Sequence, residues 1–199
     1  MFFTRDKEIS VRQELTKNRR SGSLQQKSGL ILIFIGFLCF LAAFFLWRYQ
    51  ESQKNILSFS RAPEPTVAVE EDDLPERIAI PKMGIDLSVS PARVVDNQWE
   101  TFQEGVAYLL GSGVPGREGN VVIYGHNKNY LFGPIRWLEI GDEIEVINKK
   151  GEKFVYQVME TKTVSPETVE VLAPTDDASL TLYTCTGFLD KERFVVVGK

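Results

Sequence analysis

One segment of the chain is apolar at every position, and this pattern predicts a helix. Residues 30–47 read LILIFIGFLCFLAAFFLW, without a charged side chain. As an α-helix rising about 1.5 Å per residue, the segment is about 27 Å long, close to a bilayer core of about 30 Å. A buried core helix and a cleaved signal peptide are the alternatives, but no A-x-A cleavage site follows the run. We therefore expect a retained transmembrane helix.

Charge is distributed unevenly on the two sides of this run. The chain as a whole has a formal net charge of −4. Residues 1–29 nevertheless carry an excess of Lys and Arg, whereas Asp and Glu are in excess after residue 47. The positive-inside rule then predicts a single-pass protein of the cell membrane, with a cytoplasmic basic tail over residues 1–29 and the large C-terminal part outside. The acidic balance argues against a nucleic-acid partner.

The rest of the chain divides into a polar stretch and a region of short strands. Residues 48–76 contain prolines and an acidic run but no sustained apolar period, which predicts a flexible linker. We interpret the acidic run as solvated rather than as a metal site. Residues 77–199 show short β-like runs separated by turn signals, typical of an all-β barrel or sandwich. The expected strands are residues 77–80, 86–89, 120–124, 143–147, 154–163, 179–184 and 194–197.

Two local signals add detail to this domain. Asn148-Lys149-Lys150-Gly151 lies between two β-rich runs and predicts a hairpin connection with glycine in the left-handed conformation. Residues 166–172 predict a short helix, with Ser165 as its N-terminal cap.

The rarest residues restrict the possible chemistry. The chain has one histidine and two cysteines, and Cys39 lies in the apolar run. Cys185 is therefore the only thiol of the predicted domain, which excludes an internal disulfide and a C-x-x-C redox motif. Three Cys and His residues cannot complete a four-ligand zinc site, and we expect neither a metal nor a cofactor. A reactive thiol and an inert buried thiol both remain open at this point.

Three candidate residues lie at the ends of predicted strands. His126 follows one apolar strand, Cys185 ends another, and Arg193 begins the last. Each of them alone is more often structural than catalytic. Together they form a set in which a thiolate attacks a carbonyl, an imidazole moves the proton, and a guanidinium stabilises the oxyanion.

Motifs around these residues resemble those of the sortases, the membrane-anchored cysteine transpeptidases of bacterial surfaces. Thr181-Leu182-Tyr183-Thr184-Cys185 matches the family's TLxTC motif, and Val122-Ile123-Tyr124-Gly125-His126 matches its apolar strand ending in Gly-His. Arg193 fits the third catalytic position, eight residues after the thiol. Residues 80–86 resemble the opening of the family's barrel, and Leu138 with Gly141-Asp142 resembles its L-x-x-G-D turn.

The resemblance implies a fold, an activity and partners. The fold is an eight-stranded β-barrel with short helices, here over residues 77–199. Cys185 would cleave an LPxTG-like sorting signal through a thioester, and an amine of a cell-wall precursor or a pilin lysine would resolve it. His126 would be the general acid/base and Arg193 the oxyanion stabiliser. Thr184 and the loop 165–178 would contact the substrate.

Two alternative functions remain open, and the sequence also bears on which subclass of sortases the chain resembles. A thiol hydrolase would release the peptide to water, and a membrane-tethered β-domain would bind peptides without catalysis. No apolar segment follows Arg193 and no Asp-Pro-aromatic sequence is present, so the pilin-assembling subclass is not favoured.

Overall fold

The computed structural model describes residues 32–47, 57–60, 70–95 and 98–199. The chain divides into two compact units, Met1–Ser52 and Gln53–Lys199, which we describe separately. In the first unit, residues 32–47 form an α-helix with almost entirely exposed side chains. Within the described ranges, no helix combines the length and the apolar character needed to cross a membrane. Residues 30 and 31 of the predicted span and the basic tail lie outside these ranges, so the membrane-spanning role stays a prediction.

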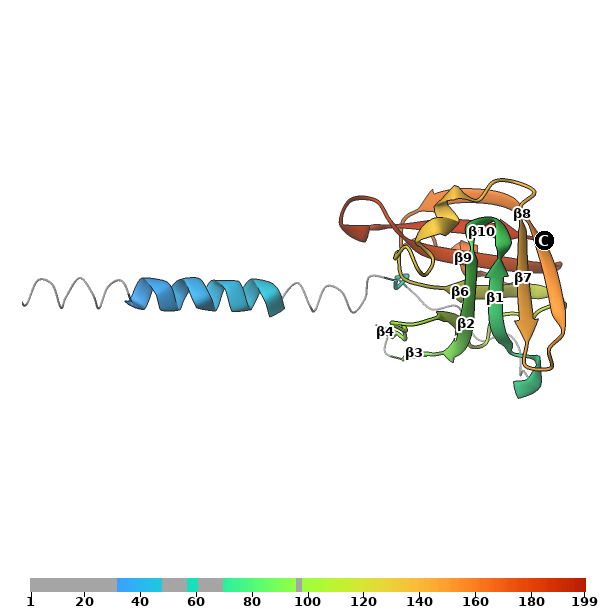
Figure 1. Ribbon diagram of the computed structural model, residues 1–199, viewed down its shortest axis with the longest axis horizontal. Coiled ribbons are helices and arrows are strands. Elements are labelled where there is room, and N and C mark those ends of the chain that lie inside the picture. Colours follow the sequence, from blue (N-terminus) through green and yellow to red (C-terminus); the bar gives the residue numbers. More distant parts are fainter. Residues whose placement is uncertain (1–31, 48–56, 61–69, 96–97) are drawn as a thin grey trace, which may run out of the picture. The chain divides into compact units, whose positions relative to one another are not determined.

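Eight strands of the second unit close into a barrel, which confirms the predicted fold (Figure 1). The order around the barrel is β1-β2-β5-β6-β9-β10-β8-β7, and β7 pairs back with β1. The pairs β2–β5 and β6–β9 are parallel, and the other neighbours are antiparallel. The barrel strands are β1 (Pro75–Ile80), β2 (Ile85–Ala92), β5 (Val106–Leu109), β6 (Gly119–Tyr124), β7 (Glu143–Asn148), β8 (Lys153–Val164), β9 (Ala178–Thr186) and β10 (Glu192–Gly198).

Shorter elements connect these strands. Among the described residues, a two-stranded sheet precedes β5, one 3-10 helix precedes β1, and four more lie in the connections. They are β3 (Val94–Val95), β4 (Gln98–Trp99), η1 (Glu71–Asp73), η2 (Pro81–Met83), η3 (Gly133–Trp137), η4 (Val169–Leu172) and η5 (Phe188–Asp190).

The seven expected strand segments all lie inside observed strands, and the hairpin is also confirmed. Gly151 has φ +80°, and its N–H donates to the carbonyl of Asn148 at 2.9 Å. The predicted helix is only partly correct, because η4 begins at Val169 with Thr168 as its N-cap residue. The predicted cap was wrong: the carbonyl of Ser165 instead accepts the N–H of Thr168 in a preceding turn.

Part of the acidic run belongs to the folded unit. Asp73 is 7% exposed and pairs with Arg117 at 2.5 Å and Lys150 at 2.6 Å. The two cations come from different loops, so this carboxylate ties the entry of β1 to both of them. Residues 70–76 thus contact the barrel.

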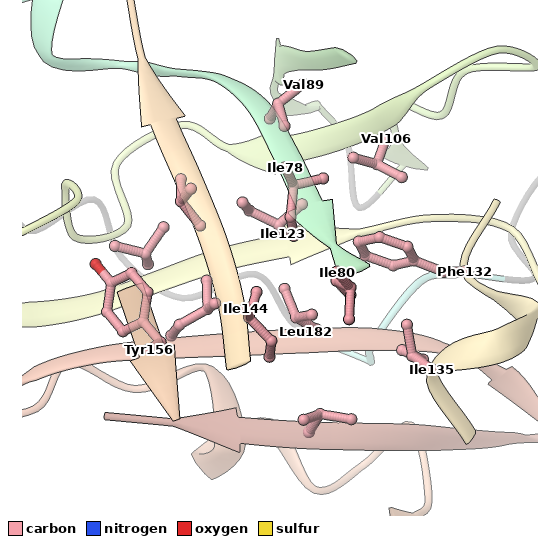
Figure 2. Close-up of a cluster of buried hydrophobic side chains, with 14 of the residues drawn as sticks. Ile78, Ile80, Val89, Val106, Ile123, Phe132, Ile135, Ile144, Tyr156 and Leu182 are labelled. Atoms are coloured by element: carbon pink, nitrogen blue, oxygen red, sulfur yellow. The ribbon is translucent and has the colours of Figure 1, made fainter. Parts of the chain in front are cut away.

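The central barrel strands carry buried apolar side chains on both faces. These side chains form two hydrophobic clusters, one on each face. An inner cluster fills the barrel, including Ile78, Ile123 and Leu182, and Figure 2 shows these side chains converging between the strands. An outer cluster, the second group of buried side chains, lies on the opposite face of the central strands. It comprises Leu57, Phe59, Ala92, Trp99, Ala107, Leu109, Val122, Tyr124, Leu172, Tyr183, Cys185 and Val195.

Strand β6 shows how the two clusters are built. Val121 and Ile123 belong to the inner cluster, whereas Val122 and Tyr124 belong to the outer one. Successive side chains of a strand point to opposite faces, so a strand between two apolar layers needs an uninterrupted apolar run. That requirement explains why residues 121–124 lack the alternation of a strand with one wet face.

Truncation inside the barrel should be costly. Ile123 is fully buried in the inner cluster, and we expect Ile123→Ala to lower the free energy of unfolding by about 2–5 kcal/mol through lost burial and a residual cavity. Urea denaturation of the purified chain measures this. Met159→Ala, at a side chain that is 52% exposed on β8, is the control and should change stability by less than about 0.5 kcal/mol. Equal effects of the two variants would contradict the assignment of the core.

Candidate active site

The pairing of β6 with β9 places the predicted histidine and cysteine at one edge of the barrel. The two strands are parallel, with Tyr124 opposite Tyr183. Parallel strands end at the same edge, so the residues that follow Tyr124 lie beside those that follow Tyr183. Those residues are His126 and Cys185, and they converge although 59 positions separate Gly125 from Thr184.

Two hydrogen bonds hold these strand ends together. The N–H of Gly125 donates to the carbonyl of Tyr183 at 3.2 Å, and the Thr184 hydroxyl donates to the carbonyl of Gly125 at 2.8 Å. Thr184 is fully buried. The Thr184 hydroxyl therefore positions the backbone before His126, and its contact with substrate stays a prediction.

Gly125 is required by close packing rather than by an unusual backbone angle. A Cβ at this position would lie 2.7 Å from Cγ1 of Val106 and 3.3 Å from the ring of Phe132. Both neighbours belong to the inner cluster and have little room to shift. Because Gly125 has no side chain, the backbone that precedes His126 can pack closely against Val106 and Phe132 at the end of the barrel.

Arg193 joins the same edge through the antiparallel pairing of β9 and β10. Its Cα lies opposite that of Cys185 in the ladder, and side chains of directly paired residues lie on the same face of a sheet. Arg193 is 3% exposed, and its Nη1 donates to the carbonyls of Asp190 and Glu192, each at 3.0 Å. The start of β10 is thus folded around the guanidinium.

Burial keeps the candidate nucleophile protonated at rest. Cys185 is 1% exposed, and desolvation raises the pKa of its thiol to about 12 against the opposing effect of Arg193. Desolvation also lowers the pKa of His126, and the nearby Lys128 lowers it further. Both shifts favour a neutral thiol and a neutral imidazole at neutral pH.

Asp190 connects the two titrating groups electrostatically. Its carboxylate raises the pKa of His126 and also that of Cys185. Asp190 lies in η5, where both it and Leu189 have φ +55°, a left-handed conformation that costs energy for residues other than glycine. The connection between β9 and β10 therefore bends sharply next to the site.

A group of aromatic rings adjoins the candidate nucleophile, and no local sequence pattern predicted it. Tyr124 and Tyr183 are stacked with centroids 5.1 Å apart, and Trp99 meets Tyr124 edge-on at 5.4 Å. Tyr124 and Tyr183 lie within the Gly-His and TLxTC motifs, each two positions before His126 or Cys185. Because alternate residues of a strand share a face, this spacing could have placed both tyrosines on the face of the candidate site. Trp99 comes from β4, whose position no periodicity indicated.

The loop 165–178 packs against the outer cluster, which contains these aromatic rings. Leu172 belongs to the outer cluster, and Val169 and Val171 pack on it. The Asn120 amide donates to the carbonyls of Val171 at 3.2 Å and Ala173 at 3.1 Å. These contacts fix the loop beside the face of β9 that also carries Cys185.

Comparison with known proteins assigns the chain to a family. The sortase domain profile matches residues 78–199. Sortase A of Listeria monocytogenes is 32% identical over 126 residues, which are 61% of this chain and 54% of that protein. The chain thus matches about half of the length of this curated relative.

Solved structures agree with the sequence match. The Listeria monocytogenes sortase A structure is 30% identical with a TM-score of 0.53, covering 64% of this chain and 86% of that one. The Sortase D5 transpeptidase of Clostridium perfringens is 26% identical with a TM-score of 0.56, covering 76% and 87%. Sortase C-1 of Actinomyces oris is 27% identical with a TM-score of 0.53, covering 61% and 70%. The chain belongs to the sortase family.

The raised thiol pKa has a measurable consequence. In a Cys39→Ser background, we expect the rate of Cys185 alkylation by iodoacetamide to rise about tenfold per pH unit from pH 7 to about 11, because the thiolate fraction grows until the pKa near 12. A plateau below pH 9 would contradict this and would indicate a standing thiolate–imidazolium pair. Mass spectrometry of the intact chain over time gives the rates.

Proposed function

We propose that the chain is a cysteine transpeptidase that cleaves an LPxTG-like sorting signal and transfers the surface protein to an amine. The observation that carries the proposal is the meeting of His126, Cys185 and Arg193 at one end of the β6–β9–β10 sheet. Membership of the sortase family supports the same chemistry.

The neutral resting pair determines how the reaction begins. Sγ of Cys185 attacks the carbonyl carbon of the Thr–Gly bond while its proton passes to the imidazole of His126. The imidazolium then protonates the departing glycine amine, leaving a thioester. An acceptor amine attacks the thioester, its proton returns through His126 to the sulfur, and the new amide departs. The acceptor is an amine of a cell-wall precursor or a pilin lysine.

Arg193 is the group suited to stabilise the negative charge that forms on the carbonyl oxygen. Its guanidinium carries a planar set of N–H groups that is buried at the site. In such a desolvated environment a fixed positive group acts more strongly than in water. The same charge already lowers the pKa of the Cys185 thiol, so it favours thiolate formation as well as attack.

Peptide turnover tests the proposal. With an LPxTG peptide and triglycine as acceptor, we expect the full chain to form the ligated product, and Cys185→Ala to lose activity by about 10³-fold or more because the nucleophile is removed. Arg193→Lys should lower kcat/KM at least about tenfold, since an ammonium lacks the planar fork. Liquid chromatography with mass spectrometry identifies the products.

The same assay separates the two alternatives. Free acid as the sole product, even at high triglycine, would favour a hydrolase. Peptide binding without a trapped thioester would favour a non-catalytic binding domain. Full turnover by Cys185→Ala would overturn the assignment of the nucleophile, and Met159→Ala serves as the unaffected control.

We also propose that residues 30–47 anchor the enzyme in the cell membrane with the barrel outside. The apolar run and the excess of positive charge before it support this placement. Protease added to intact cells should remove a C-terminal tag and leave an N-terminal tag intact. The reverse pattern of protection would invert the orientation, and release of the chain by a carbonate wash would argue against anchoring.

A further inference from the structure

A buried side-chain amide at the start of β6 holds the loop 165–178 by its backbone. Asn120 is 3% exposed, and its Nδ2 donates to the carbonyls of Val171 at 3.2 Å and Ala173 at 3.1 Å. The two acceptors flank Leu172, which is the one fully buried residue of the loop and belongs to the outer cluster. A single side chain of the barrel therefore holds the loop on both sides of the residue that anchors it.

The barrel fixes the position of this amide. In the parallel ladder between β6 and β9, Asn120 lies opposite Ser179. The carbonyl of Asn120 accepts the N–H of Gly113 at 2.8 Å on the other side of the strand. Because the backbone of Asn120 is held from both sides, its side chain is a fixed point to which the loop attaches.

The hydrogen bonds of the amide indicate what the residue contributes. Its Nδ2 has two partners, whereas Oδ1 is among the buried side-chain atoms that lack a hydrogen-bond partner. A buried acceptor without a partner is unfavourable. A leucine, which has the same branched shape, would avoid that cost at the start of β6 but would offer no donor to the loop. The two bonds to the loop are thus what an asparagine supplies at this position.

The loop connects Asn120 to the candidate site without bringing it to the reacting atoms. Leu172 shares the outer cluster with Cys185, and two further valines of the loop pack on that cluster. Asn120 itself lies near the start of β6, whereas His126 follows the end of the strand. A change at Asn120 can therefore act on the site through the position of the loop.

From this geometry we propose that Asn120 is a positioning residue: its amide sets where the backbone of the loop 165–178 lies on the outer cluster, and thereby how tightly the site binds the sorting signal. The inference rests on the proposed function, because the loop is the part to which we assign substrate contact. The barrel should fold without the two bonds, since Val171 is half-buried and Ala173 is exposed, so that water can replace the amide.

Steady-state kinetics of the full chain test the inference. With the LPxTG peptide and triglycine, we expect Asn120→Leu to raise KM for the peptide at least about threefold and to leave kcat within about twofold of the parent, because binding is weakened and the reacting groups are untouched. Asn120→Ala removes the same donors without adding bulk and should behave alike. It takes the place of the leucine variant if that variant fails to fold. A parent KM in a folded Asn120 variant would overturn the inference.

Hydrogen exchange followed by mass spectrometry measures the loop itself and does not require turnover. The N–H of Ala173 donates to the carbonyl of Glu170 at 3.1 Å within the loop. In both Asn120 variants, we expect amides of residues 165–178 to exchange at least about tenfold faster, because local opening costs less when the two bonds are absent. Parent-like exchange of the loop would show that Asn120 does not hold it and would contradict the inference.

A second buried asparagine provides a matched control. Asn148 is 2% exposed, and its amide bonds Glu152 twice, with Nδ2 donating to the carboxylate at 2.7 Å and Oδ1 accepting the N–H at 2.9 Å. It holds the turn between β7 and β8, and neither strand pairs with β6 or β9. Asn148→Leu should lower the melting temperature but leave KM and the exchange of the loop unchanged. An equal rise of KM in Asn148→Leu would assign the effect to general destabilisation and overturn the inference.

The two readouts distinguish this inference from the proposed function. If Asn120→Leu accelerates exchange of the loop but neither wild type nor variant processes the LPxTG peptide, the proposed function fails and the hold of Asn120 on the loop stands. If wild type ligates the peptide and the Asn120 variants keep the parent KM, the positioning role fails alone.

Discussion

The parallel pairing of β6 with β9 is the constraint on which the arrangement of the site depends. It aligns the ends of two strands far apart in sequence, and the hydrogen bond from Thr184 to the carbonyl of Gly125 closes that alignment at the barrel rim. The antiparallel partner β10 then has to begin where β9 ends, which sets Arg193 opposite Cys185. A shift of one residue in either ladder would turn Cys185 from the outer face to the barrel interior.

The same strands also determine the electrostatic character of the site. Because β6 and β9 are covered on both faces, the outer layer around Tyr183 and Cys185 is nearly as dry as the barrel interior. A dry environment disfavours the thiolate and the imidazolium, and it strengthens the action of each remaining charge. Arg193 and Asp190 then act on the thiol in opposite directions, so the reactivity of Cys185 depends on how the turn between β9 and β10 is held.

Local apolar runs predicted seven strands and placed three candidate residues at their ends, but they left a barrel and a sandwich open. The resemblance to sortases favoured the barrel, and the structure confirms it. The strand β5 (Val106–Leu109) was missed because its run of four residues is short and leads directly into a Gly/Pro-rich loop. The place of Phe59 was missed because Ile56, Leu57 and Phe59 form only a short apolar group in a polar stretch, too short to show a period that would signal burial. Strand order and the role of Trp99 depend on long-range pairing, which no local pattern contains.

The deep burial of Cys185 also bears on how the thiol survives. Peroxides and other oxidants attack the thiolate at an accessible sulfur, and the first product, a sulfenic acid, can proceed to forms that are not readily reversed. The domain has no second cysteine to resolve such a product as an internal disulfide. A thiol that is 1% exposed and protonated at rest offers an oxidant neither access nor charge. The burial that we expect to slow alkylation should therefore also protect this sulfur from irreversible oxidation.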